Sequence, residues 1–201
     1  MIPGVGAQAG FAIATRQGAA LEARFAARRD NAADAARFRE RAAALPDREA
    51  LLRDRRTLQF VLEAFQLEGE IGKTAIIRRV VTSDPADPDS FANRMGDPRW
   101  RQLAALVGGT AGAPFRDAAA VGRVVDATLR NRFERAMGEG NPGLREALYF
   151  RRMAAGATSV AQLMSDRALT EVARGALGLP ERFGLLSFEQ QRDMLTRRLD
   201  V

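Results

Sequence analysis

The chain contains neither cysteine nor histidine. Without cysteine it can form no disulfide bond and offers no thiolate nucleophile or metal ligand. Without histidine it lacks the usual general base near neutral pH, so its serine, threonine and tyrosine hydroxyls have no imidazole to activate them. A serine–lysine pair would depend on Lys73, the single lysine. We therefore expect a non-enzymatic protein with no catalytic residue, no metal site and no cofactor.

Long uncharged apolar runs are also missing. No segment is apolar over the length of about 20 residues that a membrane-spanning helix needs. Residues 1–7 carry none of the basic residues that begin a signal peptide. We expect no membrane span and no signal peptide.

Aromatic residues make up only 6% of the chain, whereas hydrophobic residues make up 46%. Alanine, leucine and valine must therefore fill the core. A chain of 201 residues can bury such a core as one domain or as two small lobes that share it.

The net charge of +6 comes from 31 basic and 25 acidic residues, and the two signs are interspersed. The densest basic runs, Arg28–Asp30 and Arg53–Arg56, each contain an aspartate. Nucleic-acid binding requires several phosphates to be neutralised together, so this mixture makes it an unfavoured function. An arginine stripe on one face of the fold would restore that alternative.

No segment alternates between polar and apolar residues for long enough to indicate a strand, so the pattern predicts an all-α fold. Residues 50–67 give the clearest helical stripe, and residues 115–137 predict one long helix. The β-branched residues of segment 76–81 leave a strand open there as an alternative. Leu45-Pro46-Asp47 interrupts one helix and starts another, with Asp47 as a cap.

One unit occurs twice in the chain. Residues 35–72 match residues 147–184 at a constant offset of 112 without a gap. The identical pairs are Ala35/Ala147, Phe38/Phe150, Arg39/Arg151, Ala42/Ala154, Ala43/Ala155, Leu51/Leu163, Asp54/Asp166, Arg55/Arg167, Ala64/Ala176, Leu67/Leu179 and Gly72/Gly184. A period of this length indicates repeated supersecondary structure. We expect the apolar positions of both copies to form the core: Phe38, Leu51, Val61, Phe65, Leu67, Phe150, Leu163, Val172, Leu177 and Leu179.

The repeat predicts two related helical lobes from an internal duplication, joined by a long helix. We expect a disordered segment at residues 1–10, a first lobe at 11–110, and a second lobe with the linking helix at 111–201. The glycine-rich stretch Gly108–Pro114 is the expected linker. Together the lobes would make one structural domain.

Three motifs suggest chemistry but fit structural roles better. Gly72-Lys73-Thr74 resembles the end of a phosphate-binding loop, but Leu67 stands where that loop needs glycine. Asp84–Asp89 misses the spacing of a calcium loop, and its aspartates suit helix capping. Asp54 and Asp166, present in both copies, are typical of helix caps or structural ion pairs.

Four segments together resemble a known family. They are Leu58–Leu67, Ser90–Trp100, Asn141–Phe150 and Leu177–Pro180. They are similar to an uncharacterised all-helical family of alphaproteobacteria, often encoded among flagellar genes, and the likeness covers residues 11–200. The resemblance implies a flagellum-linked role and transfers no catalytic residue. Gln66 stands where the family usually has glycine, whereas Gly178 keeps that glycine in the second copy.

Our working hypothesis is a non-enzymatic interaction or assembly protein associated with the bacterial flagellum. Its partner would be a protein such as a flagellar component, and it would be cytoplasmic or flagellum-associated. The candidate partner-binding residues lie in the distinctive 93–100 segment: Asn93, Arg94, Asp97 and Arg99. A purely structural role, with Asp97 capping the next helix, is the other interpretation of this segment. The alternative function is an arginine-rich nucleic-acid or regulatory binding module.

Overall fold

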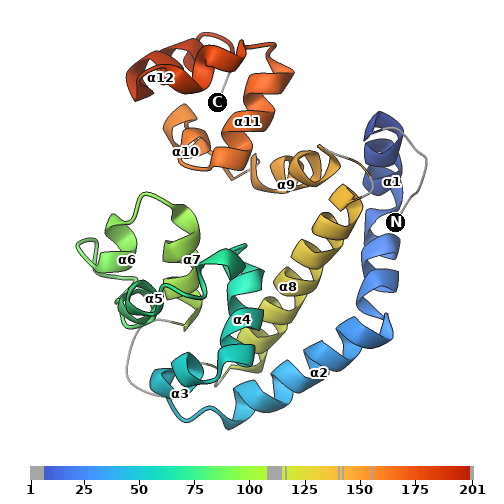
Figure 1. Cartoon of the computed structure of the whole chain (residues 1–201), viewed down its shortest axis with the longest axis vertical. Coiled ribbons are helices and arrows are strands. Elements are labelled where there is room, and N and C mark those ends of the chain that lie inside the picture. Colours follow the sequence, from blue (N-terminus) through green and yellow to red (C-terminus); the bar gives the residue numbers. More distant parts are fainter. Residues whose placement is uncertain are drawn as a thin grey trace. The chain divides into compact units, whose positions relative to one another are not determined.

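The protein is all-α. The computed structural model describes residues 7–107, 115, 117–139, 141, 143–154 and 156–199, and every regular element in these ranges is helical (Figure 1). The elements are α1 (Ala7–Ala26), α2 (Arg29–Ala44), α3 (Arg48–Arg53), α4 (Arg55–Ala64), η1 (Glu68–Glu70), α5 (Thr74–Val81), α6 (Phe91–Arg94), α7 (Pro98–Val107), α8 (Ala118–Glu139), α9 (Leu144–Ala154), α10 (Val160–Met164), α11 (Arg167–Ala176), η2 (Glu181–Leu185) and α12 (Phe188–Thr196). The strand considered at 76–81 is therefore helix α5.

The chain divides into two compact units. The large unit comprises residues 17–133, and the small unit comprises residues 1–16 and 134–201. The expected boundary at 110/111 thus differs from the observed one at 133/134. The reason is that the first turns of α8 bury Val121, Val124 and Val125 in the core of the large unit. The expected linker Gly108–Pro114 lies outside the described residues.

The disorder expected at residues 1–10 is wrong for residues 7–10, which form the first turn of α1. Residues 1–6 lie outside the described part of the chain. Within the small unit, Gly10 faces the side chains of Asn141 and Leu144, where an added Cβ would meet atoms at 3.3 and 3.2 Å. This close approach fixes the start of α1 within its unit.

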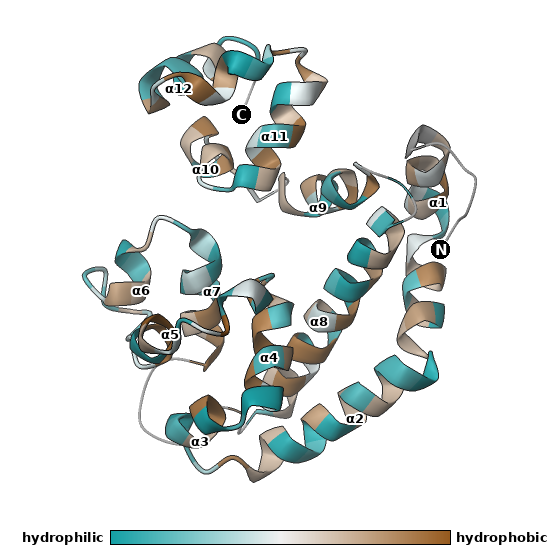
Figure 2. Ribbon diagram, viewed as in Figure 1, coloured by the Kyte–Doolittle hydropathy of each residue, from teal (hydrophilic) through white to brown (hydrophobic). Residues whose placement is uncertain are grey.

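Helix α4 lies at the centre of the large unit and contacts α2, α3 and η1. Six of its ten residues are buried: Thr57, Leu58, Phe60, Val61, Leu62 and Ala64. In contrast, α2 is a largely hydrophilic ribbon with hydrophobic bands (Figure 2). Its buried residues include Ala35, Phe38 and Ala42. This spacing of three to four residues turns one face of α2 to the core. The single tryptophan, Trp100 on α7, is buried in the same core.

The single helix expected over residues 50–67 is two helices. Asp47 caps α3 by accepting a hydrogen bond from the Ala50 N–H at 2.7 Å. Asp54 then ends α3 and caps α4 by accepting from the Thr57 N–H at 3.2 Å. The predicted capping role of Asp54 is confirmed. The break arises because Asp54 has a ψ of 83°, outside the helical range.

The small unit has its own core around α9, α10, α11 and α12. Its buried residues are Tyr149, Val160, Leu163, Leu169, Ala173, Leu179, Phe183 and Leu195. Tyr149 is the single tyrosine, and its hydroxyl hydrogen-bonds Asp166, the cap of α11. Ser187 and Gln190 form a complete capping box at the start of α12. At Ser159 only half of it forms, because the Gln162 side chain accepts from Thr158 instead.

The two units share local geometry at the predicted offset. Helices α3 and α10, and helices α4 and α11, each begin 112 residues apart. Each second helix is followed, two residues after its end, by a residue with positive φ, Gln66 at 57° and Gly178 at 62°. A bond of 2.9 Å closes each turn, from the Leu67 N–H to the Leu62 carbonyl and from the Leu179 N–H to the Arg174 carbonyl. Superposition of the complete copies, and their common origin, stay predictions.

Of the ten predicted core residues, Phe38, Leu51, Val61, Leu67, Leu163 and Leu179 are buried. The other four are half-buried: Phe65, Phe150, Val172 and Leu177. Among the described residues, no helix combines the length and the hydropathy that crossing a bilayer would require.

Candidate interaction site

A hollow of about 500 Å³ lies in the large unit between α2, α4 and α8. Its lining is dominated by charged side chains, and we call it the arginine hollow. The lining residues are Asp34, Arg37, Phe38, Arg41, Asp54, Arg56, Thr57, Gln59, Phe60, Glu63 and Arg132.

Two aromatic rings form the base of the hollow. Phe38 of α2 stacks on Phe60 of α4, with ring centroids 4.5 Å apart and planes inclined by 14°. The Arg132 guanidinium of α8 lies 5.2 Å from the centroid of Phe60. Both rings are buried, so they join the helices and leave the charged groups to face the hollow.

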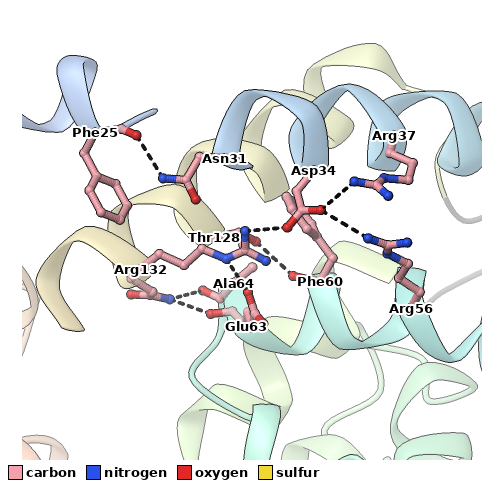
Figure 3. A network of polar contacts seen from close by, with 11 residues as sticks. Phe25, Asn31, Asp34, Arg37, Arg56, Phe60, Glu63, Ala64, Thr128 and Arg132 are labelled. Carbon is pink, nitrogen blue, oxygen red and sulfur yellow. Dashed lines mark hydrogen bonds and ion pairs between the residues drawn. The ribbon is translucent and has the colours of Figure 1, made fainter. Parts of the chain in front are cut away.

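Asp34 is the centre of the polar network in Figure 3. Its carboxylate accepts from Arg37 at 3.0 Å, from Arg56 at 3.5 Å and from Arg132 at 3.0 Å. Arg132 also donates to Glu63 at 2.7 Å. Burial would by itself lower the pKa of Arg132, but the bonds to Glu63 and Asp34 outweigh it and raise that pKa. Arg132 is therefore a fixed positive charge.

Polar groups on α8 hold it against α4 below this network (Figure 3). The Thr128 hydroxyl donates to the Phe60 carbonyl at 2.9 Å. The Asn131 amide donates to the carbonyls of Glu63 and Ala64 at 2.8 and 2.9 Å. These two carbonyls lie in the last turn of α4, where the regular bonds of the helix end, and the Glu63 carbonyl also accepts from the Gln66 N–H at 3.2 Å. The bonds thus satisfy the helix end and set the position of Arg132.

Asp54 lies at the other edge of the hollow. Arg41 donates to its carboxylate from two nitrogens, at 3.0 and 2.9 Å. Partial burial would raise the pKa of Asp54, but bonds from the Thr57 backbone and hydroxyl, together with Arg41, outweigh it and lower that pKa. A carboxylate held ionised in this way is a weak general base at neutral pH.

The segment chosen from the sequence lies elsewhere in the large unit. Asn93 donates to the carbonyls of Pro85 and Asp87 at 3.0 and 2.6 Å. Asp97 accepts from the Arg99 backbone N–H at 3.0 Å and pairs with the Arg99 guanidinium at 2.6 Å. Arg94 is exposed.

Arg99 also donates to the Gln66 carbonyl at 2.9 Å, and so ties the start of α7 to the turn after α4. Asn93 and Arg99 therefore hold neighbouring loops by hydrogen bonds. Asp97 bonds the first turn of α7, as the structural interpretation predicted. Their role in partner binding stays a prediction.

The arginine hollow was not identified from the sequence. Asp34 and Arg132 are 98 residues apart in the chain, and neither belongs to a recognisable motif. The available signal was the spacing of Thr128, Asn131 and Arg132, which places these three polar residues on one face of α8. The rejected motifs have local roles. Asp84 and Asp87 accept from backbone N–H groups two residues ahead, and the described residues contain no cluster suited to a metal ion.

Comparison with known proteins finds a family and one solved structure. The profile of a family described as "Protein of unknown function (DUF1217)" matches residues 64–201. The X-ray crystal structure of Protein AGR_C_984 from Agrobacterium tumefaciens is similar, with a TM-score of 0.86 and 25% identity. The match covers 96% of this chain and 83% of that chain. No curated protein matches the sequence. The predicted likeness to an uncharacterised all-helical alphaproteobacterial family is confirmed.

Proposed function

Since the chain belongs to the DUF1217 family of proteins of unknown function, we propose its role from its own residues, as a non-enzymatic interaction or assembly protein associated with the bacterial flagellum. The observation that carries the proposal is the arginine hollow. Its acidic groups are engaged in ion pairs and a helix cap, and its outer guanidiniums reach solvent. Such a surface suits recognition better than bond making. The flagellar part rests on the gene context of the family that the sequence resembles.

Two exposed apolar side chains in the small unit support an interaction role. Leu185 at the end of η2 is 89% exposed, and Phe188 at the start of α12 is 51% exposed. They are the large hydrophobic residues that the described part of the chain leaves most open to solvent. Exposed large apolar side chains are found on surfaces that bind other proteins.

An arginine-rich nucleic-acid or regulatory binding module is the second candidate. The exposed guanidiniums of the hollow favour it. The interspersed Asp34, Asp54 and Glu63 oppose it, because a phosphate backbone would meet these carboxylates as well. We therefore rank it below protein binding.

The test is affinity purification of the tagged full chain from motile cells, with flagellar components quantified against a tag-only control. We expect flagellar components to be enriched and cells that lack the gene to swim poorly. Leu185→Gln with Phe188→Gln should reduce the enrichment if the small unit supplies the contact. Normal motility of the deletion strain together with no enrichment of any flagellar component would refute the flagellar assignment.

A further inference from the structure

The charges around Asp34 do not balance. Three guanidiniums, of Arg37, Arg56 and Arg132, share two carboxylates, of Asp34 and Glu63. Arg41 and Asp54 form a separate one-to-one pair beside them. The cluster therefore carries one positive charge more than its own carboxylates neutralise.

The excess charge lies on the solvent side. Arg132 is held below by Glu63 and Asp34, and its side chain is only 21% exposed. Arg37 and Arg56 meet the same oxygen of Asp34 from outside, and their side chains are 44% and 70% exposed. The Arg56 contact is the longest of the three, at 3.5 Å. These two guanidiniums repel each other and retain donors that point away from Asp34.

We infer that the arginine hollow binds a carboxylate of an acidic segment on a protein partner, held between Arg37 and Arg56. The incoming carboxylate balances the cluster and relieves the repulsion between the two guanidiniums. A planar guanidinium suits this role because it can donate two parallel hydrogen bonds to one carboxylate. The inference rests on the proposed interaction function and adds the chemistry of the partner.

A protein segment fits the hollow better than nucleic acid does. The hollow has the volume of a few side chains, which suits an inserted side chain and is too small for a run of nucleotides. The rings of Phe38 and Phe60 are buried under the network, so they offer no open face for base stacking. Because the contact is near the surface, salt should weaken it.

The test is a fluorescence-polarisation titration of the full chain with a labelled peptide of alternating glutamate and alanine, about ten residues long. A peptide with glutamine in place of glutamate is the control ligand. We expect the glutamate peptide to bind at least about tenfold tighter at about 0.05 M salt, and this difference to shrink at about 0.15 M salt.

The variants isolate the two guanidiniums. Arg37→Gln with Arg56→Gln should weaken binding of the glutamate peptide by about fivefold or more. Arg39→Gln with Arg55→Gln is the matched control, because it removes the same charge from exposed positions of the same helices outside the lining. We expect the control to weaken binding by less than about twofold. Arg56→Gln alone changes the most exposed of the three guanidiniums, so we expect this variant to fold. Thermal unfolding checks that it does.

Equal loss in the two double variants, or equal binding of the two peptides, would overturn the inference. So would tighter binding of a labelled single-stranded DNA that depends on Arg37 and Arg56, which would assign the hollow to nucleic acid. The outcomes separate this inference from the proposed function. If peptide binding fails while the tagged chain still enriches flagellar components, only the binding site is wrong. If peptide binding succeeds without that enrichment, only the flagellar assignment is wrong.

Discussion

Residues 47–67 of the large unit and residues 159–179 of the small unit have the same local structure but different surroundings. Both contain a capped short helix, a second capped helix and a turn with positive φ. In the large unit, α4 is buried on most sides, since α2 and α8 both bond to it. In the small unit, α11 buries only Leu169 and Ala173.

The comparison separates local structure, which neighbouring residues determine, from burial, which distant helices determine. Caps and turns are set by residues within four positions of one another, so they recur wherever the local pattern recurs. Burial depends on which other helix packs against the repeated unit, and in the large unit Thr128 and Arg132 of α8 bond to α4. The arginine hollow exists because of that extra helix, which supplies Arg132. A different hollow lies beside α11 in the small unit, and its lining includes Arg135, Arg145 and Glu171.

The largest contrast should come from a position that is core in one copy and surface in the other. Leu62 is fully buried, and its counterpart 112 residues later is Arg174. Leu62→Ala should lower the free energy of unfolding by about 2–5 kcal/mol, because it leaves a cavity. Arg174→Ala should cost less than about 1 kcal/mol, because it removes only an exposed pair with Glu171. Urea unfolding followed by circular dichroism measures both. Similar losses would mean that α11 is covered as α4 is.

The second contrast concerns the α8 contact itself. Asn131→Ala should cost about 1–3 kcal/mol, because it removes the amide bonds to the carbonyls of Glu63 and Ala64, and the second of these bonds is buried. Arg130→Ala, on the same helix with a salt bridge of 3.5 Å to Glu22, is the control and should cost less than about 1 kcal/mol. Equal effects would show that the amide bonds do not fix α8 against α4.

The repeated caps should give closely matched losses. Asp54→Ala and Asp166→Ala should each cost about 0.5–2 kcal/mol. Asp54 adds a pH dependence, because its folded-state pKa lies below the ordinary value of 3.8. The charge of Asp54 stabilises the folded state fully above pH 3.8. This stabilisation is lost as the pH falls through the folded-state pKa of Asp54. The stability difference between the wild-type chain and Asp54→Asn should therefore shrink below that pH. A constant difference from neutral to acid pH would rule out the charge contribution.

The smallest effect should come from the two turns. Gln66 has a φ that glycine adopts more easily, and Gly178 occupies the same conformation in the other unit. Gly178→Gln should lower stability by about 1 kcal/mol. Gln66→Gly should raise it by less than about 1 kcal/mol, because the lost bond from Gln66 to Asn131 offsets part of the gain. A loss of stability in Gln66→Gly would mean that this side-chain bond outweighs the backbone strain.

Much of the fold could be predicted from local signals, but the hollow could not. The helical class followed from periodicity, and the caps at Asp47 and Asp54 followed from residue type and position. The predicted unit boundary was wrong because no local signal in the sequence indicates that α8 packs on α4. The network around Asp34 could not be predicted for the same reason, since its ion pair with Arg132 joins residues 98 positions apart.

The single tryptophan and the single tyrosine fall in different units. Trp100 is buried in the large unit and Tyr149 in the small one. The wild-type chain thus carries one intrinsic optical reporter for each unit, and neither needs to be introduced by mutation. Tryptophan fluorescence follows the unfolding of residues 17–133, while tyrosine absorbance follows that of the small unit. Coincident transitions would mean that the units unfold as one cooperative system, and separate midpoints would give each unit its own stability.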